Sequence, residues 1–330
     1  MTKSCGVTCA MSSIFSTSGC GVGTQTTSFP GCPEYGSNGF CAAACAPART
    51  ANPETASAPP QTATTAAIAL TGICAAASAQ TTPPQTQKPY EPTVGQAGKD
   101  VVWVPTPQTL VNKMLDMAKA TPQDFVMDLG SGDGRTVITA AKRGIRAMGI
   151  EYNPDMVALS ERNATAANVT AKATFRKADL FETDLSKATV ITMFLLPSIN
   201  MKLRPKILDL KPGTRIVTNT FTMEEWQADQ QETISGDCSG WCTALLWYVP
   251  AKVEGTWKVT AGGNSSNLTL KQEFQNLTGS LGSSPITDAK MKGEEITFTV
   301  GPAKYTGKVT GNSMSGRIAG GAGGSWSATK

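Results

Sequence analysis

The sequence predicts an α/β fold in which a doubly wound, mostly parallel sheet is followed by a small antiparallel β module, either a sandwich or a barrel. Between residues 100 and 250, short apolar runs alternate with segments of helical periodicity, which is the pattern of a parallel sheet covered by helices. After residue 251, short alternating runs are separated by Gly, Asn and Ser, which is typical of an antiparallel meander. We therefore expect two folded domains, 100–250 and 251–330.

Residues 1–79 have the composition of a leader without a core of its own. Seven of the nine cysteines lie in it, and the pairs Cys5/Cys9 and Cys41/Cys45 have metal-like spacing. Their neighbours are mostly Ser, Thr, Gly and Ala, which cannot bury enough apolar surface to fold. We expect a disordered, Cys-containing leader rather than a zinc or disulfide module, and no metal site.

Residues 66–79 (AAIALTGICAAASA) are similar to the apolar region and cleavage site of a secretory signal, although little positive charge precedes them. The run is too short to span a bilayer, so we expect no stable membrane insertion. If cleavage follows Ala79, the protein is exported to the periplasm, where Cys238 and Cys242 can pair. Otherwise it stays in the cytoplasm with two buried free thiols. Residues 80–99 then have the composition of an extended linker.

Composition narrows the chemistry that the chain can perform. Its 330 residues include no histidine, so the commonest general base and the commonest zinc ligand are both missing. The net charge of +4 is too small to indicate nucleic acid or an anionic membrane as a partner. Catalysis must therefore depend on carboxylates, hydroxyls, amides or the positioning of the reactants.

The α/β domain is predicted to begin with a helix that has Thr106 as its cap and Pro107 at the first helical position. Asn153 and Pro154 predict the start of a later helix in the same way. The other expected elements are, in chain order, a strand at 125–127, a helix at about 135–143, strands at 147–150, 173–175 and 189–194, a helix at about 202–210, and strands at 214–219 and 245–249.

A glycine-rich loop, residues 128–134 (DLGSGDG), follows the first strand, where doubly wound sheets bind ligands. A dinucleotide-binding loop needs a third glycine where Arg135 stands, and the carboxylates of Asp128 and Asp133 would repel a pyrophosphate. S-adenosylmethionine (SAM) has no phosphate and carries a sulfonium and an ammonium, which carboxylates attract. The loop therefore predicts SAM as the cofactor and argues against a nicotinamide oxidoreductase.

Acidic residues also follow the next two strands. Glu151 can accept hydrogen bonds from a ribose diol. Asp179 can accept one from the adenine amino group, while Leu180 offers backbone groups and Phe181 an apolar face. Because the carboxyl ends of parallel strands meet at one edge of a sheet, we expect these residues to surround one adenosine.

The loop, together with Gly-Ile-Glu at 149–151 and Ala-Asp-Leu-Phe at 178–181, resembles the motif series of class I SAM-dependent methyltransferases. The segments 104–107 (VPTP) and 203–206 (LRPK) are similar to bacterial relatives of the mitochondrial lysine methyltransferases that modify the ATP synthase c-subunit and the adenine nucleotide translocator. The resemblance covers roughly residues 100–250.

This resemblance implies a SAM site and a protein lysine as the methyl acceptor. It places residues at the methionine part, the ribose, the adenine and the closing side of the site. The cofactor-binding residues that it implies are Asp128, Gly130, Ser131 and Gly132 in the loop, Glu151 at the ribose, Asp179 and Leu180 at the adenine, and Thr106 at the closing side.

The segment 194–197 (FLLP) departs from the Asn-Pro-Pro-Tyr type of motif that methyltransferases acting on amide or base nitrogens often carry. It has no polar group to orient a planar amide. It is either a channel for an extended side chain such as lysine or simply the hydrophobic end of a strand. The catalytic residue stays unknown, since Glu224, Glu225 and Asp229 are candidates by position only and are more simply a solvated cluster.

The module at 251–330 is expected to contain about six strands, with 255–257 (GTW) and 324–326 (GSW) as matched closing elements. No constellation of catalytic residues occurs in it, so packing or recognition is its expected role. The function predicted for the whole chain is SAM-dependent methyl transfer. The alternative is an exported, non-catalytic binding protein that retains the methyltransferase fold, because SAM is made in the cytoplasm.

Overall fold

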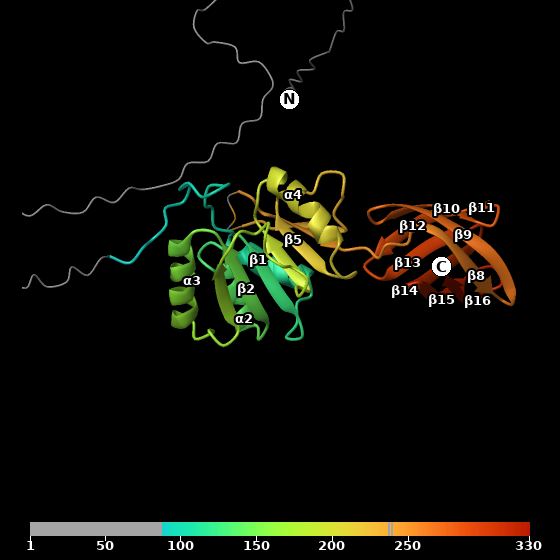
Figure 1. The fold of residues 1–330 in the computed structure, drawn as a ribbon, viewed down its shortest axis with the longest axis horizontal. Helices are drawn as coiled ribbons and strands as arrows, with labels where there is room; N and C mark the ends of the chain where they lie inside the picture. Colours follow the sequence, from blue (N-terminus) through green and yellow to red (C-terminus); the bar gives the residue numbers. More distant parts are fainter. Residues whose placement is uncertain (1–87, 237, 239) are drawn as a thin grey trace, which may run out of the picture. The chain divides into compact units, whose positions relative to one another are not determined.

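The computed structural model describes residues 88–236, 238 and 240–330, which form an α/β domain and a β-barrel (Figure 1). The predicted fold class is confirmed, and the module after residue 251 is a barrel rather than a sandwich. The expected leader and the signal-like segment ending at Ala79 lie outside the described residues. Among the described residues, no helix has both the length and the apolar character that a membrane crossing needs.

The α/β domain has a seven-stranded sheet in the order β3-β2-β1-β4-β5-β7-β6. Its strands pair in parallel from β3 to β5, and β7 is antiparallel to both β5 and β6. The chain order reverses between β1 and β4, where sheets of this kind bind ligands. The strands are β1 (Phe125–Leu129), β2 (Arg146–Glu151), β3 (Ala173–Lys177), β4 (Val190–Met193), β5 (Arg215–Asn219), β6 (Gln230–Thr233) and β7 (Thr243–Tyr248).

Helices cover both faces of this sheet, as predicted. The helices α1 (Gln108–Met117), α2 (Arg135–Lys142) and α3 (Pro154–Ala166) contribute to one hydrophobic core, and α4 (Pro197–Leu208) contributes to the other. Neighbouring residues of β1 enter different cores, Val126 the first and Met127 the second, because successive side chains of a strand point to opposite faces.

The start of α1 differs from the prediction. The helix begins at Gln108, and Pro107 is its N-cap without a side-chain hydrogen bond. Thr106 is therefore not a helix cap. Its carbonyl oxygen instead accepts a hydrogen bond from Arg135 Nη1 at 3.0 Å, which ties the segment before α1 to the start of α2.

Three other elements show what local patterns reveal and what they miss. The predicted cap of α3 is confirmed, because the Asn153 side chain accepts a hydrogen bond from the Asp155 amide at 2.9 Å. Helix α4 begins at Pro197, before the expected start at 202, because a proline at the first position is pre-organised for a helix. Strand β6 was not predicted because its sequence, QQET, is polar and mostly exposed.

The second domain is a closed, up-and-down antiparallel barrel of eight strands, with the short β11 beside β10. β16 pairs with β8, so the predicted closing elements GTW and GSW are confirmed. The expected six strands are too few because strands such as β15 (SMSGRIA) contain little apolar alternation. The strands are β8 (Gly255–Ala261), β9 (Asn264–Glu273), β10 (Asn276–Leu281), β11 (Ser284–Pro285), β12 (Thr287–Lys292), β13 (Glu295–Val300), β14 (Ala303–Thr310), β15 (Ser313–Ala319) and β16 (Gly324–Thr329).

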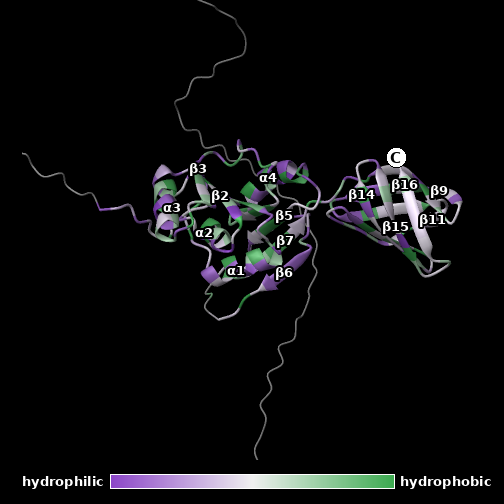
Figure 2. Cartoon of the chain, turned by 90° about the horizontal axis from the view of Figure 1, so that it is seen from below, coloured by the Kyte–Doolittle hydropathy of each residue, from purple (hydrophilic) through white to green (hydrophobic). Residues whose placement is uncertain are grey.

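The barrel has a packed aromatic core. The Phe298 and Tyr305 rings are stacked with centroids 4.6 Å apart, and the Trp326 ring meets Phe298 edge-on at 5.6 Å. Buried and exposed residues alternate along β8 and β16, and Figure 2 shows the mixed hydropathy of the barrel strands. These aromatic contacts supply much of the core of this small domain.

Candidate active site

The eight residues predicted to bind the cofactor line one pocket at the carboxyl ends of β1 to β4. The sheet brings them together from four separate parts of the chain. They are Thr106 before α1, Asp128, Gly130, Ser131 and Gly132 at the end of β1, Glu151 at the end of β2, and Asp179 and Leu180 after β3. The remaining predicted residue, Phe181, does not line the pocket and instead packs against a hydrophobic core.

The glycine loop bends tightly beneath the pocket. Gly132 has a φ of 55°, and a Cβ atom there would lie 2.7 Å from Trp103 Nε1, so only glycine allows this close approach. The amides of Gly130 and Ser131 both donate to the Ile150 carbonyl oxygen, at 2.9 and 3.1 Å. The hydroxyl of Ser131 is buried without a hydrogen-bond partner among the described residues, so a polar ligand group can pair with it.

Asp128 is the most deeply buried carboxylate of the pocket. Its Oδ1 accepts a hydrogen bond from Thr192 Oγ1 at 2.6 Å, which joins β1 to β4 at the point where the strand order reverses. Burial raises the pKa of Asp128 to about 7, against the opposing effect of hydrogen bonds from Thr192 and Thr136. A cationic ligand beside this group would favour its charged form.

The second loop carboxylate, Asp133, has its charge largely compensated. Arg135 donates to it through Nε at 3.0 Å and through Nη2 at 2.6 Å. Because Arg135 offsets the charge of Asp133, the expected repulsion of a pyrophosphate depends on Asp128 and not on Asp133. The negative charge of the pocket depends on Asp128 and Glu151 instead.

Glu151 closes the loop from the end of β2. Its Oε2 accepts a hydrogen bond from the Gly132 amide at 3.0 Å, and its Oε1 accepts one from the Asn153 amide, also at 3.0 Å. Each carboxylate oxygen has a second lone pair, so both can still accept from a diol. The two amide contacts hold the carboxylate at the edge of the pocket.

Asp179 is held by its own loop and by a distant lysine. Its Oδ1 accepts from the Phe181 amide at 2.8 Å, and its Oδ2 lies 2.6 Å from Lys99 Nζ. The Lys99 ammonium holds the pKa of Asp179 below its usual range. The same ammonium lies 4.5 Å from the centre of the Tyr152 ring.

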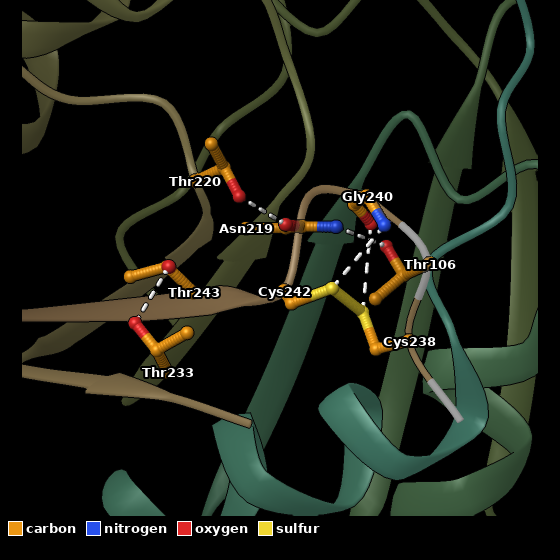
Figure 3. Close-up of a disulfide and its surroundings, with 8 residues drawn as sticks. All are labelled: Thr106, Asn219, Thr220, Thr233, Cys238, Gly240, Cys242 and Thr243. Carbon is orange, nitrogen blue, oxygen red and sulfur yellow. Dashed lines mark hydrogen bonds between the residues drawn. A yellow bond between two sulfur atoms is a disulfide. The ribbon is translucent and has the colours of Figure 1, made fainter. Parts of the chain in front are cut away.

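The segment 96–105 also lines the pocket, although residues up to 99 were expected to be linker. This segment is folded rather than extended: the Trp103 amide donates to the Gln96 carbonyl oxygen, and the Gly95 amide donates to Trp103, at 2.9 and 2.8 Å. Thr106 follows it, with its hydroxyl 3.4 Å from Asn219 Nδ2 (Figure 3). The aromatic side chain of Trp103 in an otherwise apolar VVWVP run is the one signal that could have indicated this role.

A second hollow adjoins this pocket and shares Phe194 and the segment 97–102 with it. Val104 also lines both spaces, and the further walls of the second hollow are Leu196, Phe221 and Trp241. The candidate bases Glu224, Glu225 and Asp229 line neither space. Among them, Glu225 pairs with Arg204 at 2.5 Å, and the Asp229 carboxylate accepts from the Tyr248 amide at 2.8 Å, so structural partners occupy both.

The pocket suits the chemistry of SAM. The buried carboxyl group of Asp128 can pair with an ammonium or a sulfonium. The Ser131 hydroxyl has no hydrogen-bond partner among the described residues, and the glycine loop lets a ligand approach the backbone closely. A pyrophosphate would meet the carboxylates of Asp128 and Glu151 instead of bare amides. The residues present therefore fit SAM better than a dinucleotide.

Comparison with known proteins identifies relatives of this α/β domain. The ANTKMT methyltransferase domain matches residues 128–230. A protein-lysine N-methyltransferase of Saccharolobus islandicus (strain REY15A) is 45% identical over 129 residues, which are 38% of this chain and 80% of that protein. The adenine nucleotide translocase lysine N-methyltransferase of Mus musculus is 36% identical over 119 residues, which are 36% of this chain and 52% of the mouse protein.

Among solved structures, an RNA methyltransferase from Salinibacter ruber in complex with S-adenosyl-L-homocysteine has 44% sequence identity. The match covers 46% of this chain and 96% of that chain, with a TM-score of 0.43. The chain spans about half the length of the mouse relative and 80% of the length of the Saccharolobus islandicus one. It therefore belongs to the ANTKMT methyltransferase family and is an enzyme that uses SAM as its cofactor.

Proposed function

We propose that the enzyme transfers the methyl group of SAM to the side-chain amine of a lysine in a protein. Two relatives are named as lysine methyltransferases, which supports this acceptor. The observation that carries the proposal is that an apolar hollow meets the cofactor pocket at Phe194. Phe194, Leu195 and Leu196 offer no side-chain hydrogen bond to a planar amide or base, but they can pack against the methylenes of lysine.

SAM supplies an electrophilic methyl group on its sulfonium. In this proposal, Asp128 attracts the ammonium of the methionine part, Glu151 accepts from the ribose, and Asp179 accepts from the adenine. The amine reacts in its neutral form, its proton having passed to solvent, and the walls align its lone pair with the methyl group. This route needs no histidine and no dedicated base.

The acceptor can be identified by following labelled methyl groups. The full chain is incubated with methyl-labelled SAM and separate protein and RNA fractions of its host, and the labelled protein is hydrolysed to amino acids. We expect the label in methyllysine, with Asp128→Asn as a matched inactive control. Label in RNA, or in another amino acid, would contradict the proposal while leaving methyl transfer itself intact.

SAM affinity is expected to fall about eightfold when the pH is lowered from 7.5 to 6. The pKa of Asp128 is about 7 in the free protein, so the carboxyl is mostly ionised at the higher pH and mostly protonated at the lower. A bound ammonium favours the ionised form, so binding at pH 6 must expel a proton. Calorimetric titration in buffers of different ionisation enthalpy measures both effects, and a flat affinity with no proton release would show that Asp128 does not contact the cation.

We also propose that the enzyme works in an oxidising compartment such as the periplasm. The support is the disulfide between Cys238 and Cys242, since such bonds persist mainly outside the cytosol (Figure 3). Intact cells are treated with a maleimide, with and without prior reduction, and the peptide carrying both cysteines is analysed by mass spectrometry. We expect labelling only after reduction, and labelling of unreduced cells would refute this location.

A further inference from the structure

Three aromatic side chains form one wall of the hollow beside the cofactor pocket. The Phe194 and Phe221 rings are stacked with centroids 5.8 Å apart and an interplanar angle of 19°. The Trp241 ring meets Phe194 edge-on at 6.0 Å. These three residues, called here the aromatic wall, come from the end of β4, the end of β5 and the loop before β7. The sheet therefore gathers them at its carboxyl edge, beside the cofactor pocket.

Hydrogen bonds from side chains of β5 and α4 fix the backbone at Phe221 and Thr222. Its carbonyl oxygen accepts from Thr218 Oγ1 at 2.6 Å, and the next carbonyl, that of Thr222, accepts from Asn200 Nδ2 at 3.1 Å. Asn200 is completely buried in α4, so its amide belongs to the rigid part of the domain. The backbone that carries Phe221 is thus pre-organised rather than a loose surface feature.

Trp241 is exposed and strained at the same time. Its side chain is 48% exposed, and its φ of 50° lies in the left-handed region, which is unfavourable for a bulky residue. The Cys238–Cys242 disulfide and a hydrogen bond from the Ile234 amide to the Cys242 carbonyl oxygen, at 2.9 Å, hold this conformation. Exposed apolar area and backbone strain both cost stability, and such costs concentrate where a ligand is bound.

We propose that the aromatic wall binds the aliphatic chain and the methylated ammonium of the acceptor, with Trp241 as the residue that determines specificity. This assignment deepens the proposed function and rests on it. Aromatic ring faces attract a cation, and tryptophan does so most strongly. Asp100 and Lys99 also line the hollow, and the Lys99 ammonium is paired with the Asp179 carboxylate at 2.6 Å. Apart from the indole N–H of Trp241, this wall offers no side-chain hydrogen bond to a flat amide or a nucleobase.

The test measures binding without methyl transfer. The full chain, saturated with S-adenosylhomocysteine, is titrated with the amide of N-acetyl-Nε-trimethyllysine and with its neutral analogue, in which carbon replaces the charged nitrogen. We expect the wild type to prefer the cation. In Trp241→Ala, we expect binding of the cation to weaken about tenfold. Trp241→Phe is expected to keep most of the affinity, because it keeps a ring at this position.

Two controls separate this assignment from other causes. Affinity for S-adenosylhomocysteine should stay unchanged in Trp241→Ala, which shows that the cofactor pocket is intact. Val94→Ala removes apolar surface from a side chain that is 63% exposed and lines neither space, and it should bind the probe like the wild type. Equal probe affinity in Trp241→Ala and wild type, or no probe binding by the wild type, would overturn the assignment. The methyl-labelling experiment tests the lysine acceptor independently of that result.

Discussion

Asp128→Asn is expected to weaken SAM binding about 100-fold at pH 7.5 and to make the protein without SAM more stable. The weaker binding follows from the loss of a buried charge beside a cation, an interaction of about 3 kcal/mol. The gain in stability follows from linkage. The folded-state pKa of Asp128, about 7, is above the ordinary aspartate value of 3.8, so ionising this carboxyl in the folded protein costs stability as the pH rises between these values.

Calorimetry with SAM and thermal unfolding without it measure the two effects. The melting temperature of Asp128→Asn should exceed that of the wild type by several degrees at pH 8, and by less at pH 5, where the folded wild type is already protonated. Asparagine keeps the volume of the side chain and an acceptor for the Thr192 hydroxyl. A variant that binds SAM normally would remove Asp128 from the site, and a variant that is less stable at pH 8 would refute the linkage argument.

Gly134→Ala is expected to destabilise the α/β domain by about 3 kcal/mol. Gly134 has a φ of 82°, where an alanine costs roughly 1–2 kcal/mol, and its added Cβ would lie 2.8 Å from the Phe175 ring and 2.9 Å from Ser160 Cβ. These neighbours belong to β3 and α3, so the substitution pushes apart elements that meet beneath the glycine loop. Such a loss is a large fraction of the stability of a typical domain.

Denaturant unfolding checks this prediction, and Gly144→Ala is its matched control. Gly144 has a similar φ of 81°, but the nearest atom to an added Cβ is Pro122 Cγ at 3.8 Å. The control therefore measures the backbone cost without the clash, about 1 kcal/mol. Equal losses in the two variants would mean that Phe175 and Ser160 move aside and that packing beneath the loop is not tight.

The buried parts of this fold are predicted well because their apolar residues recur with the period of a helix or form the short apolar run of a buried strand. Asp128 is the last residue but one of β1 and Glu151 is the last residue of β2, so apolar runs that lead into acids predict both the strands and the cofactor pocket. Strand β6 is not predicted because an exposed edge strand buries little surface and needs no alternation of apolar residues. The start of α1 is misplaced by a short distance because Thr106 is used for a tertiary contact with Arg135 instead of a cap.

The parts that sequence reasoning misses are contacts between distant segments. Lys99 reaches Asp179 across 80 residues, and no local pattern distinguishes it from a solvated linker lysine. The position of Trp241 could not be predicted from local patterns either, because it depends on contact with Phe194, which stacks on Phe221 at the sheet edge. Only the folded sheet brings these residues together.

The pairing of β16 with β8 limits how the barrel can recognise a partner. In the described part of the chain, the barrel closes on itself, so apart from the two-residue β11 its strands offer no unpaired edge to which an extended peptide could add by β-augmentation. The open sheet does have two edges, β3 and β6, but exposed Arg176 and Lys177 on β3 and the polar β6 disfavour such pairing. Any partner of the barrel must therefore be selected by its outward side chains and hairpin loops.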